Sequence, residues 1–150
     1  MLDQLEREGE RIRRAPLAEA LLFLWQEEAA VSKQRSEFLQ KETELIERLA
    51  AQTGKNGAFS ANQVNLHAIA DKYLPMTSGG NARYRFAKAV EMGRDSAAVL
   101  SLAPRYENAA MVMEMRGLRK AVNVPLMQLS FDGDWDESAW SRLRSFLYYC

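Results

Sequence analysis

The stretch that decides the fold runs from Pro16 to Thr53 and reads PLAEALLFLWQEEAAVSKQRSEFLQKETELIERLAAQT. It has 38 residues, no glycine, and one proline at the start, where proline suits the first turn of a helix. Apolar residues recur every three or four positions, which predicts a helix with one apolar face. An unbroken helix of this length would span about 57 Å, whereas a compact chain of this size has a radius of gyration of about 15 Å. We therefore expect one protruding helix or a helical hairpin.

Charged residues within this stretch indicate how it packs. The heptad that takes Leu17 and Leu21 as core positions also places three charged residues on the same seam. They are Glu28, Arg35 and Glu42. A simple two-stranded coiled coil disfavours charges at such positions. The pattern therefore favours a core-forming helix or two stacked helices, with a homodimeric coiled coil as the alternative.

Shorter helices are predicted on both sides of the long stretch. Their expected spans are 1–14, 60–74, 82–92, 104–122 and a last helix that Asp134 caps. Residues 97–103 are expected to form a short apolar turn, and residues 126–131 a short strand or an irregular segment. The predicted fold class is all-α, with five to seven helices in a single domain over residues 1–150.

Composition sets few limits on function. The chain has 20 basic and 20 acidic residues, so its total charge predicts no partner. Its single cysteine, Cys150, cannot form an internal disulfide, which fits a reducing cytoplasm. The apolar run Ala20–Trp25 is too short for a membrane span and has no signal-peptide form. We expect a soluble, cytoplasmic protein with no membrane partner.

The charges are unevenly distributed along the chain. Residues 76–123 hold eight Lys or Arg and four Asp or Glu, a balance of +4, whereas residues 1–75 and 124–150 each have a balance of −2. This basic helical segment supplies every predicted nucleic-acid-binding residue: Arg83, Arg85, Lys88, Arg94, Arg105, Arg116, Arg119 and Lys120. Tyr84 and Phe86 lie among the first three, and guanidinium and aromatic groups bind phosphates and stack on bases. The alternative is that these cations are the solvated faces of amphipathic helices.

The loop before the first basic helix offers a second phosphate-binding feature. Ser78-Gly79-Gly80-Asn81 precedes the expected start of the helix, where backbone N–H groups can bind an anion. No Lys-Ser or Lys-Thr pair follows the glycines, so the pattern does not match a nucleotide-binding loop. A nucleic-acid phosphate would suit the same geometry.

No metal or catalytic site is predicted. Asp132, Asp134 and Asp136 have the spacing of the first calcium-loop ligands, but Glu137 replaces the required glycine and Leu143 the required glutamate. Turn and cap chemistry explains these aspartates better. The single histidine, His67, is expected to be structural or exposed. We expect no enzyme activity and no cofactor.

Two stretches resemble a known family. They are Leu74-Pro75-Met76-Thr77-Ser78 leading to Arg83-Tyr84-Arg85-Phe86, and Leu102-Ala103-Pro104-Arg105-Tyr106-Glu107-Asn108-Ala109. Together they are similar to the small helical subunits of CRISPR effector complexes, which act in antiviral defence. The resemblance covers roughly a third of the chain, and the long helix has no counterpart in it. It implies a non-catalytic subunit, packed in copies along a ribonucleoprotein, whose arginines contact guide or target strand.

These patterns lead to two functional hypotheses. The first is a non-catalytic subunit of a larger assembly that binds RNA or single-stranded DNA along its backbone through a basic face. Its partners would be other protein subunits or copies of itself. The alternative is a helical protein-interaction module, a regulator or inhibitor, that docks through the long amphipathic helix.

Overall fold

The computed structural model describes residues 2–32, 44, 48, 63–104, 107, 119–131 and 137–150. The chain divides into two compact units, residues 1–63 and residues 64–150, and each is described by itself. The predicted single domain over the whole chain stays a prediction. None of the described helices is long and apolar enough to cross a membrane.

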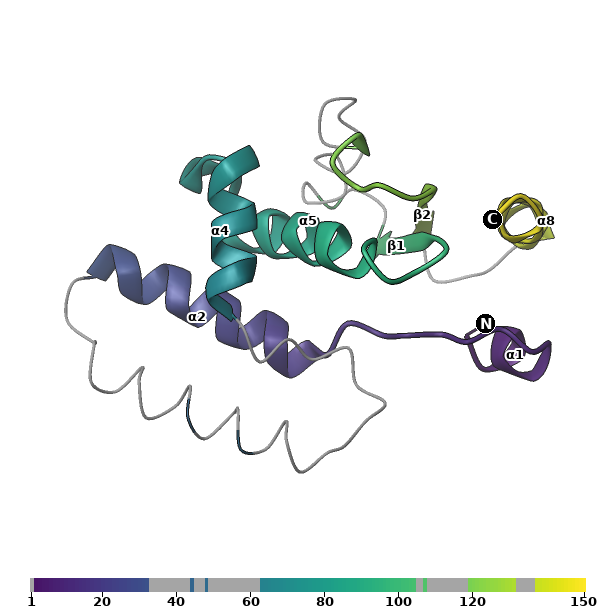
Figure 1. Ribbon diagram of the computed structural model, residues 1–150, viewed down its shortest axis with the longest axis horizontal. Coiled ribbons are helices and arrows are strands. Elements are labelled where there is room, and N and C mark those ends of the chain that lie inside the picture. The colour runs from purple at the N-terminus through teal and green to yellow at the C-terminus, as the bar shows by residue number, and fades with distance from the viewer. Residues whose placement is uncertain are drawn as a thin grey trace. The chain divides into compact units, whose positions relative to one another are not determined.

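The first unit contains α1 (Leu2–Arg7) and α2 (Leu17–Ser32) (Figure 1). The helix predicted for residues 1–14 ends early because Gly9 adopts a positive φ of 98°, a conformation that glycine reaches easily. Arg14 folds back onto α1 and donates hydrogen bonds to the carboxylates of Asp3 (3.0 Å) and Glu6 (3.2 Å). The bond to Asp3, followed by the charge of Glu6, raises the pKa of the Arg14 guanidinium.

Helix α2 occupies the first part of the predicted long helix. Leu22 and Phe23 are buried on it, and so are Glu19 and Glu27. Glu44 and Arg48 are also helical. Whether residues 16–53 form one helix or two lies outside the described residues.

The second unit begins with two helices that pack crosswise. Helix α4 (Gln63–Tyr73) ends just before Pro75, as predicted, because the residue before a proline disfavours helical backbone. A short 3₁₀ turn, η1 (Met76–Ser78), then leads into α5 (Gly80–Met92). Tyr73 and Phe86 join the two helices through an edge-to-face ring contact, with the ring centroids 5.3 Å apart.

The second unit also contains a parallel two-stranded sheet, so the all-α prediction is wrong. Strand β1 (Val99–Pro104) pairs with β2 (Leu126–Phe131), in a register that sets Val99 opposite Leu126 and Pro104 opposite Phe131. Strands of parallel sheets are often continuous apolar runs without alternation, and a short run of that kind does not distinguish strand from turn by its period.

The sheet corrects two local predictions. Residues 97–103 were expected to form a turn, but most of them belong to β1. Pro104 was expected to open a helix and instead ends the strand, a position where a proline is tolerated. The rest of the helix predicted for residues 104–122 lies largely outside the described residues. For residues 126–131, the strand is the alternative that the structure confirms.

Gly93 connects helix and sheet. It follows α5, and a Cβ added there would lie 3.2 Å from the Ala89 carbonyl oxygen and 3.2 Å from Val122. This close approach holds the segment before β2 against the end of α5. The unit is completed by α8 (Glu137–Tyr148), on which Leu143 is fully buried.

Candidate nucleic-acid interface

Two of the predicted binding residues on α5 are buried. The Arg83 side chain is 1% exposed and donates to the carbonyl oxygen of Leu74 and to the carboxylate of Asp71. Lys88 is also buried, and its Nζ lies 2.7 Å from the Glu91 carboxylate. The basic face expected for this helix therefore does not expose these two side chains. Both cations are committed to partners within the chain and present no charge to a strand.

Arg85 on α5 is half-buried and lies next to Glu107. Its Nη1 lies 3.2 Å from Glu107 Oε2, close enough for an ion pair, but the two atoms are not aligned for a hydrogen bond. Asn81 donates to the other oxygen of the same carboxylate at 2.6 Å. Glu107 thus neutralises part of the positive charge of Arg85, which was predicted to bind a nucleic acid.

The aromatic residues among these cations are also internal. Tyr84 is 5% exposed and Phe86 is 1% exposed. Neither ring offers a face on which a base could stack. Along α5, basic and aromatic residues therefore form a core with internal ion pairs.

The other predicted residues have varied positions. Arg94, on the turn after α5, is exposed, and so is Lys120. Arg119 is exposed and donates one hydrogen bond, 2.7 Å long, to the carbonyl oxygen of Leu126 at the start of β2. Arg105 and Arg116 lie outside the described residues. Binding through Arg94, Arg119 and Lys120 stays a prediction.

The predicted phosphate loop forms the junction between η1 and α5. Gly79 has a positive φ of 81°, and as a glycine at the N-cap position of α5 it has no side chain that could cap the helix. Asn81, in the first turn of α5, donates a hydrogen bond to Glu107. Phosphate binding at this loop stays a prediction.

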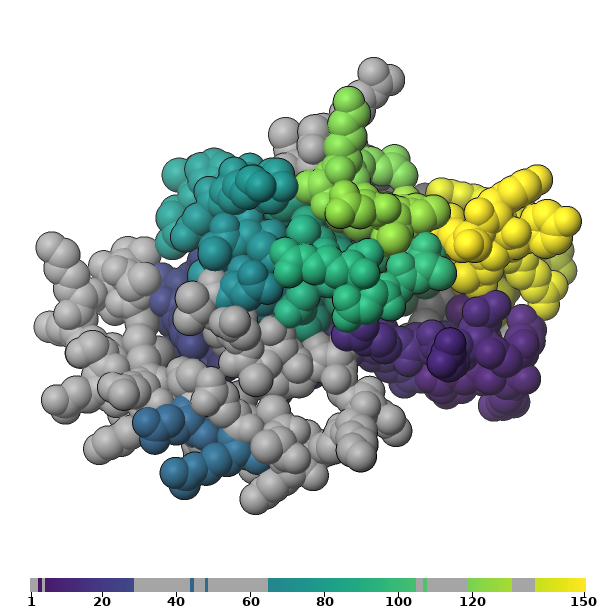
Figure 2. Space-filling model, in the orientation of Figure 1, coloured from purple at the N-terminus to yellow at the C-terminus, as the bar shows by residue number. Residues whose placement is uncertain are grey.

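A polar pocket lies between β2 and α8, and we call it the β2–α8 pocket. Its volume is about 690 Å³. Its lining residues are Arg119, Leu126, Met127, Gln128, Ser141, Arg142, Ser145 and Phe146. Among the residues that the structure describes, the lining contains two arginines and three neutral polar side chains and no carboxylate, so this part of the pocket favours an anionic ligand. Figure 2 shows the segment around β2 in light green beside α8 in yellow.

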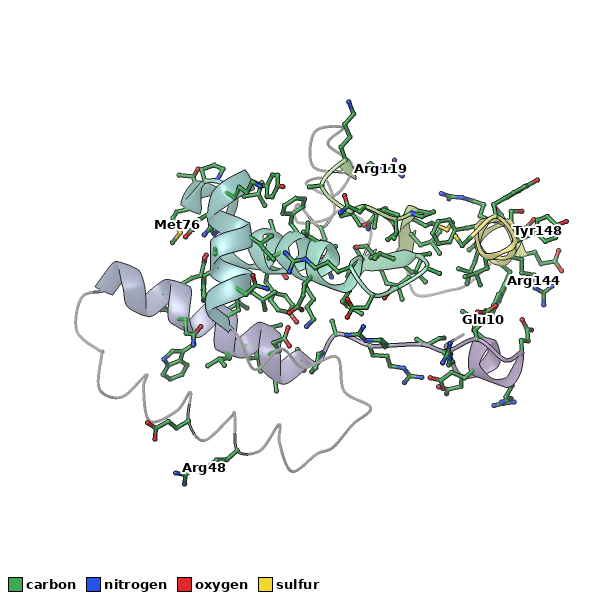
Figure 3. The ribbon with its side chains drawn as sticks, in the orientation of Figure 1. Glu10, Arg48, Met76, Arg119, Arg144 and Tyr148 are labelled. Atoms are coloured by element: carbon green, nitrogen blue, oxygen red, sulfur yellow. The ribbon has the colours of Figure 1, made fainter. Side chains whose placement is uncertain are left out.

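The spacing of residues along α8 produces this lining. Ser141 and Ser145 are four residues apart, as are Arg142 and Phe146, so the four side chains form one helical face. The neighbouring face carries Arg144, whose guanidinium carbon lies 5.9 Å from the centre of the Trp140 ring. Figure 3 labels Arg144 and Tyr148 on this helix and Arg119 before β2.

Sequence reasoning missed Arg142, Arg144 and Gln128. The two arginines belong to residues 124–150, and the net charge of −2 over that segment predicts no basic site there. The aspartates at 132, 134 and 136 determine that sum, yet α8 begins only at Glu137. A charge count on the helix alone, with its four-residue spacing, would have indicated a basic, aromatic face.

Metal and acid–base chemistry have little support in the described part of the chain. No group of three or more potential metal ligands occurs among those residues. Asp132, Asp134 and Asp136 lie outside them. His67 is half-buried on α4, and it takes part in an interaction there.

Comparisons with known proteins add no assignment. No family model, no curated protein and no solved structure matches the chain. The case for a function therefore depends on the residues themselves. Among the features above, the β2–α8 pocket joins the most chemically informative side chains.

Proposed function

We propose that this protein is a non-enzymatic subunit that binds a single nucleic-acid strand through its phosphates at the β2–α8 pocket. The observation that carries the proposal is the described part of the pocket lining, in which Arg119 and Arg142 lie beside Ser141 and Ser145. Guanidinium groups bind phosphate oxygens through paired N–H donors, and serine hydroxyls add further donors. This is the chemistry that a phosphodiester needs.

Two further observations support a strand as the ligand. Lys120 follows Arg119 and is exposed, so positive charge continues beyond the pocket. On α8, Arg144 and Trp140 add a cation and an aromatic ring beside the pocket face. Proteins that bind single strands combine a positively charged path with aromatic rings on which bases stack.

The protein would still belong to a larger assembly, as predicted from sequence. Its nucleic-acid contacts would lie at the β2–α8 pocket and not on α5. The partners are other protein subunits or copies of this chain, together with RNA or single-stranded DNA. The chain would act in the cytoplasm, where its single cysteine would stay reduced. A CRISPR effector complex is one such assembly, and this suggestion depends on the sequence resemblance alone.

The test is salt-dependent binding of a labelled single-stranded RNA to the wild type and to the variant Arg119→Ala/Arg142→Ala. The slope of log K against log salt is negative, and each lost phosphate contact makes it less steep by about 0.7. We therefore expect the slope of the double variant to be less steep by about 1.4. The matched control is Arg7→Ala/Arg11→Ala, which removes the same charge from exposed positions of the first unit. An unchanged slope in the pocket variant, or an equal decrease in the control, would contradict the proposal.

A specific observation favours the second candidate, a protein-interaction module. Leu17, Leu21 and Trp25 follow one another at four-residue spacing on α2 and are 75%, 58% and 38% exposed. Such a stripe is typical of a helix that docks into an apolar groove. The variant Leu17→Ser/Leu21→Ser should then lose self-association or co-purification with a partner while RNA binding stays unchanged. Unchanged association would count against this candidate.

A further inference from the structure

The middle of β2 contains a buried amide with no partner. Gln128 lies opposite Ser101 in the parallel pair, and among the described residues neither its Nε2 nor its Oε1 has a hydrogen-bond partner. Its neighbours on the strand, Met127 and Leu129, are apolar. A buried polar group without a partner destabilises the fold, so a leucine would suit this position better. The glutamine therefore needs an explanation other than packing.

Gln128 also lines the β2–α8 pocket. The residue as a whole is only half-buried, and a glutamine side chain has three rotatable bonds. A rotation about these bonds can turn the amide into the pocket. There it would present an N–H donor beside a carbonyl acceptor, the pair that matches the edge of a nucleobase.

The other lining residues supply what the rest of a nucleotide requires. Phe146 gives an aromatic wall, and aromatic side chains stack on bases of any sequence. Arg119 and Arg142 supply the phosphate donors. The volume of about 690 Å³ falls within the range of roughly 300 to 1,000 Å³ that is usual for pockets holding one small molecule.

We propose that the β2–α8 pocket holds one nucleotide of the bound strand and that Gln128 pairs with the edge of its base. This inference rests on the proposed function and deepens it, because it adds base recognition to phosphate binding. The arginines hold the phosphate, Phe146 packs against the base, and the amide gains the two hydrogen bonds that it lacks without ligand. Gln128 is then a specificity-determining residue.

The experiment measures binding of the four nucleoside 5′-monophosphates and of ribose 5-phosphate to the whole chain by NMR titration. At least one monophosphate should bind the wild type about tenfold more tightly than ribose 5-phosphate, which has the same phosphate and no base. In Gln128→Leu this difference should vanish, while the affinity for ribose 5-phosphate stays the same. The midpoint of thermal unfolding should rise, since the unpartnered amide is gone.

The controls separate this inference from the proposed function. Gln26→Leu removes a glutamine from α2 and should leave both affinities unchanged. Gln128→Met keeps the side-chain length and replaces the leucine variant if that variant does not fold. An equal preference for the monophosphate in wild type and Gln128→Leu overturns base pairing by Gln128 but leaves phosphate binding intact. If neither monophosphate nor ribose 5-phosphate binds the wild type, the proposed function fails as well.

Discussion

Helices α5 and α8 have similar length and composition but use their charges differently. They span 13 and 12 residues, and each carries arginines among aromatic side chains. On α5, Arg83 and Lys88 are buried and paired with acids of the same chain. On α8, Arg142 and Arg144 are exposed, and Leu143 between them is the residue that is fully buried. On α5, burial and an acidic partner within the chain thus commit two cations to the fold, whereas both arginines of α8 lie at exposed positions.

The strongest test of this difference is Arg83→Ala. Its guanidinium is almost fully buried, donates to a backbone carbonyl and pairs with Asp71, whose side chain is 66% exposed. We expect the free energy of unfolding to fall by about 3 kcal/mol, through the lost hydrogen bonds and the lost packing of the stem. Urea denaturation measures this loss. The exposed Arg94→Ala should change stability by less than about 0.5 kcal/mol, and equal stability of the two variants would contradict the assignment.

A smaller loss is expected for Lys88→Ala. The Lys88 side chain is 4% exposed and its Glu91 partner is 21% exposed, so the pair is shielded from water on one side. Removal of the stem and the charge should cost about 1.5 kcal/mol in the free energy of unfolding. Lys88→Met keeps most of the stem and should cost less. If Lys88→Met is as destabilising as Lys88→Ala, the ion pair rather than the packing dominates.

These residues also show how far sequence reasoning extended. The ends of α4 and α5 were well predicted, because Pro75 and Gly93 interrupt the apolar pattern there. The parallel strands were not predicted as a pair, since their partners are 27 positions apart, Val99 with Leu126, and no local pattern encodes that pairing. The burial of Arg83 was not predicted for a similar reason. Arg83 faces inward because Asp71 and the Leu74 carbonyl oxygen receive it, and these groups approach only when α4 and α5 pack.

On α8, Arg144→Ala should have a modest effect on stability. The guanidinium lies over the Trp140 ring at an exposed position, where such a contact contributes about 0.5 kcal/mol. The free energy of unfolding should decrease by that amount, and the Trp140 fluorescence should shift toward that of a ring in water. Arg144→Lys should keep part of the contact. A loss above about 2 kcal/mol would show that Arg144 is structural, as Arg83 is.

The smallest effect on stability is expected for Arg142→Ala, and this variant sharpens the comparison most. Arg142 is exposed and lines the β2–α8 pocket, so its loss should change the free energy of unfolding by less than about 0.5 kcal/mol. Its effect should appear in binding instead: the salt slope for single-stranded RNA should fall by about 0.7, with no dependence on sequence. Arg83→Ala, measured at a urea concentration where it is still folded, should keep the wild-type slope. If Arg142→Ala keeps that slope and Arg83→Ala loses it, the contact surface lies on α5 after all, because the buried pair must then open to meet the strand.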